Sequence, residues 1–245
     1  MSPAVRRAGR AIARSLGDLC VTVGALVLLF VVWQLWWTDL SAGRTQQALT
    51  HELQQQWDDA PPVAVPGAGP VVAGDPAPPT PPLGEPFALI HVPRFGADYV
   101  RPVLQGTTPE VLEEGVGHYE GTAGPGQVGN FAVAGHRVTY AKPFNEIDRL
   151  QAGDAVVVET QDSWYVYTVR SHQVVSPHQV DAVSAVPGRP GARATARMLT
   201  LTACHPEFSA RERYVVLAEL DRTLAKEDGR APAVLAAPAS ARAGR

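Results

Sequence analysis

The longest apolar run in the chain covers residues 19–37, LCVTVGALVLLFVVWQLWW, and contains no charged side chain. A helix of that length can cross the roughly 30 Å hydrocarbon core of a bilayer. Three of the last five residues of the run are tryptophans, as in the aromatic belts found at headgroup level. Arginines precede the run, so the positive-inside rule predicts that residues 1–18 are cytoplasmic and that the chain after Thr38 is extracellular.

A cleaved secretion signal is the alternative interpretation of this run. It fits poorly, because the run is long and the residues after it, Thr38-Asp39-Leu40, offer no small-residue cleavage site. Bulky tryptophans at the end of the run would also make a poor peptidase substrate. The sequence therefore predicts an uncleaved, single-pass anchor in the cell membrane.

The segment that follows the anchor, residues 38–86, has the pattern of a stalk. Residues 41–59 are polar and glutamine-rich but carry apolar side chains at every fourth position, which predicts a short amphipathic helix near the membrane surface. Ten of the 26 residues from 61 to 86 are prolines. That composition predicts a semi-rigid polyproline spacer, which would hold the rest of the chain away from the membrane.

Residues 87–222 form the one segment able to bury a core. In most of it, apolar and polar residues alternate as they do in short β-strands. Strands are predicted over residues 87–91, 99–104, 130–134, 155–159, 164–176, 197–203 and 213–219. Thr108-Pro109-Glu110 predicts the start of a short helix that Gly115 closes, and residues 143–150 predict one or two helical turns. Many short strands with few helices indicate a mainly β fold, a closed or nearly closed barrel. Residues 223–245 are rich in Ala, Arg, Gly and Pro and are expected to be disordered.

Charge and cysteine content narrow the function. The formal net charge of −3 provides no basic field for nucleic acid, and none is expected as a partner. The two cysteines, Cys20 and Cys204, would be separated by the membrane, so Cys204 would be a lone thiol in an oxidising compartment. Such a thiol is either reactive or buried and inert. No spacing of histidines with cysteines or carboxylates predicts a metal site, and no cofactor is expected.

Three residues suited to acyl transfer lie at the ends of predicted strands. His136 follows the strand that ends at Ala134, Cys204 directly follows a second strand, and Arg213 opens a third. Neighbouring strands would bring them together at one end of the barrel. A histidine can activate a thiol, and an arginine can supply fixed donors to an oxyanion. Arg211 has the same strand parity as Arg213 and is the alternative arginine.

These segments resemble the sortase family. Residues 200–216, TLTACHPEFSARERYVV, resemble the sortase signature TLxTC followed by an arginine before an apolar strand. Residues 130–137, NFAVAGHR, resemble the sortase histidine motif. The surrounding GHYEGTAGPGQVGN and the anchor WQLWWTDLSAGR are most similar to class E sortases. The resemblance implies an eight-stranded sortase-type barrel with short helices, preceded by one transmembrane helix.

The resemblance also implies a reaction. Sortases cleave an LPXTG-like sorting signal between Thr and Gly, class E members favour LAXTG, and the acyl group passes to an amine. The partners would be surface proteins that carry the signal and a peptidoglycan precursor or another amine acceptor. Cys204 would be the nucleophile, His136 the general acid and then the base, and Arg213 the group that holds the carbonyl and the oxyanion.

Three further residues are candidates for substrate binding. Tyr119, close to the histidine motif, is a plausible groove residue, and Thr202 and Ala203 precede the nucleophile. Ala203 stands where the family usually has threonine. Because that position is expected to help line the groove, the change bears on substrate detail more than on the type of reaction.

Two other functions remain open at this point. An L,D-transpeptidase is also a cysteine acyltransferase of the cell wall, but its cysteine follows small residues in an S-x-G-C context that Thr202-Ala203-Cys204 does not match. A non-catalytic adhesin or pilin-like module on a stalk should carry a C-terminal sorting signal or an adhesive repeat, and the chain has neither.

Overall fold

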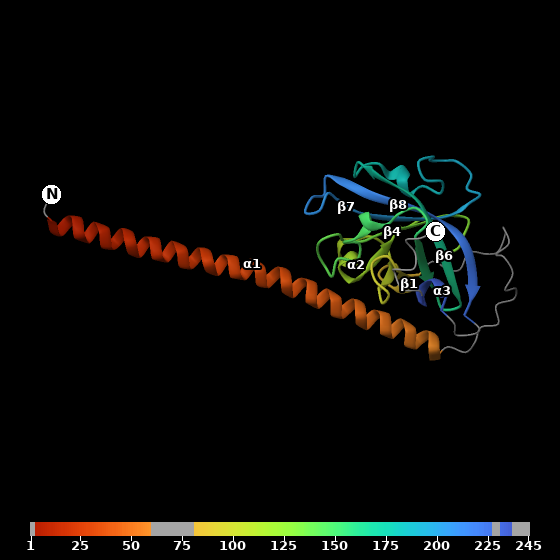
Figure 1. Ribbon diagram of the computed structural model, residues 1–245, viewed down its shortest axis with the longest axis horizontal. Helices are drawn as coiled ribbons and strands as arrows, with labels where there is room; N and C mark the ends of the chain where they lie inside the picture. Colours follow the sequence, from red (N-terminus) through yellow and green to blue (C-terminus); the bar gives the residue numbers. More distant parts are fainter. Residues whose placement is uncertain (1–2, 60–80, 227–230, 237–245) are drawn as a thin grey trace.

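The computed structural model describes residues 3–59, 81–226 and 231–236 of the chain. Figure 1 shows a single long helix, α1, beside a compact barrel, with the N-terminus far from the barrel. Most of the predicted polyproline spacer and the end of the predicted disordered tail lie outside the described residues.

Helix α1 runs without interruption from Pro3 to Asp59 and so includes both the predicted anchor and the predicted amphipathic segment. By length and composition it could cross a membrane, and the described side chains of its apolar part are exposed. The predicted amphipathic segment is helical, but it is not a separate short helix, because it continues α1, and the end of α1 packs on the barrel. Its buried residues recur at helical spacing on one face: Ala42, Gln46, Thr50 and Leu53.

Eight strands close the barrel in the order β1-β2-β3-β4-β7-β8-β6-β5. Their bounds are Pro86–His91 (β1), Val100–Gln105 (β2), Val116–His118 (β3), Gly129–Ala134 (β4), Ala155–Glu159 (β5), Ser163–Val175 (β6), Arg197–His205 (β7) and Glu212–Ala225 (β8). Short helices stand between them at Pro109–Glu114 (α2), Ile147–Arg149 (η1) and Val180–Val183 (η2), with α3 at Ala233–Ala236. The mainly β barrel with short helices is confirmed.

Two strand pairs are parallel, β2 with β3 and β4 with β7, and the others are antiparallel. Apolar side chains from alternate positions of the strands fill the interior. On β7 these are Leu199, Leu201 and Ala203, whereas Thr200 and Thr202 point to the other face. The threonines are also buried, so both faces of β7 are covered. A strand in this central position forms a rigid support for the residue at its end.

Several predicted boundaries need correction. Strand β8 continues to Ala225, which pairs with Ser163, so the barrel domain extends beyond residue 222 into the predicted tail. Leu235 of α3 then packs against the cluster around Trp164. The sequence missed β3 because three residues are too few to show a period. Between residues 143 and 150 the helix is one 3-10 turn, η1.

The helix predicted from its capping residues is confirmed as α2. Thr108 caps it by accepting a hydrogen bond from the Val111 N–H at 3.5 Å, and Pro109 occupies the first helical position. Gly115 ends it. This helix places the Glu113 side chain close to the loop that follows β4.

Candidate active site

The three candidate catalytic residues lie at the ends of three adjacent strands: His136 follows β4, Cys204 lies near the end of β7, and Arg213 lies near the start of β8. Strands β4 and β7 run parallel with Ala134 opposite Thr202, and the next N–H of the loop, from Gly135, still bonds to the Thr202 carbonyl at 3.0 Å. Two residues beyond that pair, the two segments reach His136 and Cys204. On the other side of β7, Cys204 lies directly opposite Arg213. The strand register therefore places the three residues at one level.

The same three residues also share a face of the sheet. Cys204 alternates with Ala203, whose side chain is in the core, so the thiol points to the outer face. Arg213 precedes the core residue Tyr214 and therefore points outward as well. His136 continues the parity of Ala134, outside the core cluster. The site is thus an outer edge of the barrel at the end of three strands.

His136 is half-buried, and this burial lowers the pKa of its imidazole below the usual value, while the Glu113 carboxylate opposes that shift. Its Nε2 atom is buried and makes no hydrogen bond within the described residues. The imidazole is therefore not bonded through Nε2 to the half-buried Cys204 thiol. The centroid of the His136 ring lies 5.0 Å from that of the Tyr140 ring. A hydrogen bond to the Glu113 carboxylate raises the pKa of the Tyr140 hydroxyl.

The structure distinguishes the two candidate arginines. Arg213 is part of β8, and its Nη1 donates to the carbonyls of Ala210 and Glu212, both at 3.0 Å. No described group accepts a hydrogen bond from its Nε or Nη2, so one edge of the guanidinium is available to a ligand. Arg211 lies before β8 begins, is exposed, and donates from Nε to the Ser209 hydroxyl. Of the two arginines, only Arg213 pairs with β7, the strand that carries Cys204.

Sequence reasoning overlooked Arg137. Its side chain is 3% exposed, its Nη2 forms an ion pair with Asp148 at 2.8 Å, and its Nη1 lies 3.0 Å from Nδ1 of His205. Because guanidinium only donates, His205 Nδ1 is the acceptor. Arg137 thus joins the residue after His136 to the residue after Cys204. A single sequence offers no sign of this, since the partner is 68 residues away.

The loop after His136 depends on helix α1. Tyr140, Ala141 and Lys142 have positive φ angles of 53°, 58° and 49°, a conformation that costs about 1–2 kcal/mol for each non-glycine residue. Gln46 donates from Nε2 to the Tyr140 carbonyl at 3.0 Å, and Asp39 forms an ion pair with Lys142 at 2.9 Å. Gln46 belongs to the predicted stalk, but its side chain is only 2% exposed.

The three predicted substrate-binding residues lie in different environments. Tyr119 is half-buried, and its hydroxyl lies 3.0 Å from that of Thr202, which in turn donates to the Val133 carbonyl. Tyr119 remains a candidate for the groove, and the Thr202 hydroxyl holds the Tyr119 hydroxyl in place. Ala203 is 3% exposed and belongs to the core, so the expectation that its side chain lines the groove is wrong. Strand alternation is the reason: the residue beside an outward-facing cysteine must face inward.

Another histidine near the site has a structural role. His118 is buried, with Nδ1 2.8 Å from Gln105 Oε1 and Nε2 2.9 Å from the Thr122 hydroxyl. Burial lowers the pKa of its imidazole. Across the described ranges, no group of three or more histidine, cysteine or carboxylate side chains is placed to hold a metal ion.

Comparisons with known proteins agree with this geometry. The family model described as "Sortase domain" matches residues 90–221. The chain is 36% identical to sortase SrtE1 of Streptomyces coelicolor over 240 residues, which cover 94% of this chain and 64% of SrtE1. It is 32% identical to SrtE2 of the same organism, with 93% and 90% covered. The chain thus spans less than two thirds of the length of SrtE1.

Solved structures show the same likeness. Sortase E from Streptomyces avermitilis superposes with a TM-score of 0.57 at 42% identity, covering 62% of this chain and 98% of that one. Sortase E1 from Streptomyces coelicolor with a tripeptide in its active site superposes with the same TM-score of 0.57 at 36% identity, covering 62% of this chain and 97% of that one.

Removing the Arg137 side chain is predicted to destabilise the barrel. Arg137→Ala deletes hydrogen bonds to the charged Asp148 and to the half-buried His205 imidazole, and bonds to charged groups contribute about 1.5–3 kcal/mol each. Because Asp148 is half exposed and can be rehydrated, we expect a loss of about 2–3 kcal/mol in the free energy of unfolding, measured by urea denaturation. Arg149→Ala removes an exposed ion pair on the adjacent turn and should cost less than about 0.5 kcal/mol. Equal losses would contradict the role given to Arg137.

Proposed function

The chain belongs to the sortase family, whose members are cysteine transpeptidases, and on that premise we propose that it cleaves a sorting signal and transfers the acyl group to an amine. The observation that carries this proposal is the register of β4, β7 and β8, which aligns His136, Cys204 and Arg213 on one face. No observation favours the L,D-transpeptidase or the non-catalytic adhesin.

In the first half of the reaction, the Cys204 thiolate attacks the carbonyl carbon of the signal's threonine. The oxyanion that forms needs donors that are already in place, and the free edge of the Arg213 guanidinium supplies two N–H groups in a fixed fork. Collapse of this intermediate breaks the peptide bond, and protonated His136 gives its proton to the leaving glycine amine. The product is a thioester on Cys204.

In the second half, an amine attacks the thioester. His136, now neutral, accepts the proton of the attacking amine, the new amide bond forms, and the Cys204 thiolate leaves. The enzyme returns to its starting protonation state. The unpartnered Nε2 of His136 supports this double role, because no other described group competes for the proton.

The finer features of the proposal rest on the family. We propose an LPXTG-like signal, of the LAXTG variety, with Tyr119 in the groove that holds it. The tripeptide in the active site of Sortase E1 shows that a related protein binds a short peptide there. The acceptor would be the amine of a peptidoglycan precursor or another amine. The apolar part of α1 would anchor the chain with the barrel outside the cell.

Replacement of the nucleophile tests the reaction type. Cys204→Ala should abolish formation of a covalent adduct with a sorting-signal peptide that ends in a vinyl sulfone, measured by mass spectrometry of the intact protein. The melting temperature should change little, because the half-buried thiol is not part of the core cluster. Cys20→Ser, which leaves the site untouched, should label like the parent. Because removing the nucleophile of a catalytic triad costs about 10⁶-fold in kcat, transpeptidation by Cys204→Ala above a few per cent of the parent rate would refute the mechanism.

Charge-conserving changes test the choice of arginine. Arg213→Lys keeps the charge but loses the fork, so kcat should fall about 10²–10³-fold, the usual cost of losing an oxyanion donor. Arg211→Lys, at an exposed position before β8, should cost less than about tenfold. Steady-state kinetics with a sorting-signal peptide and an amine nucleophile compares the two. If Arg211→Lys is instead the variant with the large loss of kcat, Arg213 is not the residue that stabilises the oxyanion.

The pH dependence tests the role of His136. The active form of the site pairs a thiolate with an imidazolium, and it is a minority species in equilibrium with the neutral thiol and imidazole. The rate should therefore follow a bell-shaped pH profile whose two apparent pKa values belong to the coupled pair rather than to either residue. Since burial lowers the pKa of His136, the acid limb should lie below the ordinary value of 6.5. Glu113→Gln removes the charge that opposes this shift. The acid limb should then move to lower pH and the plateau rate should fall.

The neighbouring residue provides the control for this test. Glu114→Gln changes the same charge on α2 but leaves Glu113 in place, so its profile should match the parent. High salt should reduce the effect of Glu113→Gln, because Glu113 is exposed and its field is screened. A rate that rises steadily into alkaline pH would mean that the reaction needs no protonated His136.

A further inference from the structure

The contacts of α1 set the height of the barrel along the helix. The loop after His136 meets α1 at Asp39 through Lys142, at 2.9 Å, and at Gln46 through the Tyr140 carbonyl, at 3.0 Å. At about 1.5 Å of rise per residue, these two positions lie about 3 and 14 Å beyond Trp37, where the apolar run ends. The headgroup zone occupies roughly 5–8 Å on each side of the hydrocarbon core. The loop beside the catalytic histidine is therefore at or just above headgroup level.

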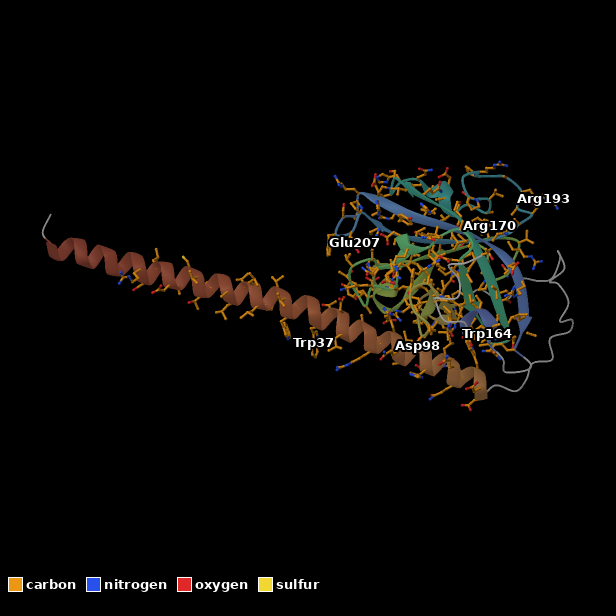
Figure 2. All side chains as sticks on the ribbon, in the orientation of Figure 1. Trp37, Asp98, Trp164, Arg170, Arg193 and Glu207 are labelled. Carbon is orange, nitrogen blue, oxygen red and sulfur yellow. The ribbon has the colours of Figure 1, made fainter. Side chains whose placement is uncertain are left out.

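The connection between β7 and β8 belongs to the same end of the barrel. Glu207 in this connection accepts a hydrogen bond from Asn145 Nδ2 at 3.3 Å, five residues after Tyr140. In Figure 2, Glu207 lies at the edge of the barrel that faces the N-terminal part of α1, and Trp37 lies at a similar position along the helix. Arg193 lies on the opposite side of the barrel. The β7–β8 connection thus lies at the edge of the barrel that faces the apolar half of α1.

An apolar side chain projects from this connection. Phe208 is 87% exposed, the largest exposed fraction among the large apolar side chains of the described residues. It sits in a turn closed by a hydrogen bond from the Ser209 N–H to the Pro206 carbonyl at 3.0 Å, and its φ angle is 60°. A bulky residue seldom adopts this left-handed conformation, which costs about 1–3 kcal/mol. The turn presents the ring to the surroundings instead of packing it against the barrel.

We propose that the barrel rests on the outer surface of the phospholipid bilayer with its Cys204 edge turned toward the lipid, and that Phe208 enters the interfacial zone. The inference rests on the proposed membrane anchoring by α1. One phenylalanine would hold a soluble protein to a membrane only weakly. Here the spanning helix already keeps the barrel at the surface, so the effective concentration is high and the ring need only fix the orientation.

Nitroxide labels on single cysteines test the orientation in the full chain. The background is Cys20→Ser with Cys204→Ala, and the chain is reconstituted into vesicles of phosphatidylcholine and phosphatidylglycerol. Labels are placed at Phe208→Cys, at Leu28→Cys in the apolar part of α1, and at Arg193→Cys on the opposite side of the barrel. Collisions with membrane-soluble oxygen and with a water-soluble nickel chelate report the depth of each label.

We expect the label at 28 to collide with oxygen and to be shielded from nickel, and the label at 193 to collide freely with nickel. The label at 208 should be shielded from nickel relative to the label at 193. Asp39→Asn with Gln46→Ala, which removes the two contacts between α1 and the loop after His136, should reduce this shielding. If the label at position 28 is shielded from nickel but the label at 208 is as accessible to nickel as the label at 193, the proposed anchoring holds and the proposed orientation is wrong. If 28 is also accessible to nickel, α1 does not span the bilayer, and both the anchoring and the orientation are wrong.

Discussion

The position of strand β7 between a parallel and an antiparallel neighbour is the constraint on which the site depends. Its pairing with β4 brings the chain after Ala134 to the level of Cys204, and its pairing with β8 puts Arg213 opposite. Either pairing alone would bring only two of the three residues together. A shift of one residue in either register would turn one of the three candidate catalytic side chains toward the core. Burial of β7 on both faces makes such a shift costly, since Leu199 and Thr200 would exchange environments.

A second requirement is the support of a strained loop. The three consecutive left-handed residues from Tyr140 to Lys142 are unfavourable by themselves, and the loop is held by contacts outside the barrel. Helix α1 provides a buried glutamine and an ion pair, and Tyr140 in turn packs its ring against His136. Helix α1 is therefore joined to His136 through a short chain of contacts. The candidate membrane-spanning helix and the candidate active site are thus parts of one structure.

Sequence patterns revealed the elements whose order is local and missed those that depend on distant partners. The apolar run, the capped helix after Thr108 and the alternating strands were predictable, because each rests on residues within one element. The nucleophile and its neighbours were recognisable from motifs on strand ends. Arg137 and Gln46 were not, because their importance comes from partners that only the fold brings near. Ala203 was misassigned for a related reason: motif proximity to the cysteine says nothing about which face a side chain takes.

The parallel pairing of β4 with β7 has a consequence for when the candidate site is assembled during folding. Parallel strands cannot be joined by a tight turn, and here the chain between them forms β5 and β6 before it returns. Contacts of such long sequence separation form late in folding. Before the barrel closes, Cys204 has neither His136 nor Arg213 nearby. Under the proposed mechanism, closure of the barrel therefore assembles the candidate site, which a half-folded chain lacks.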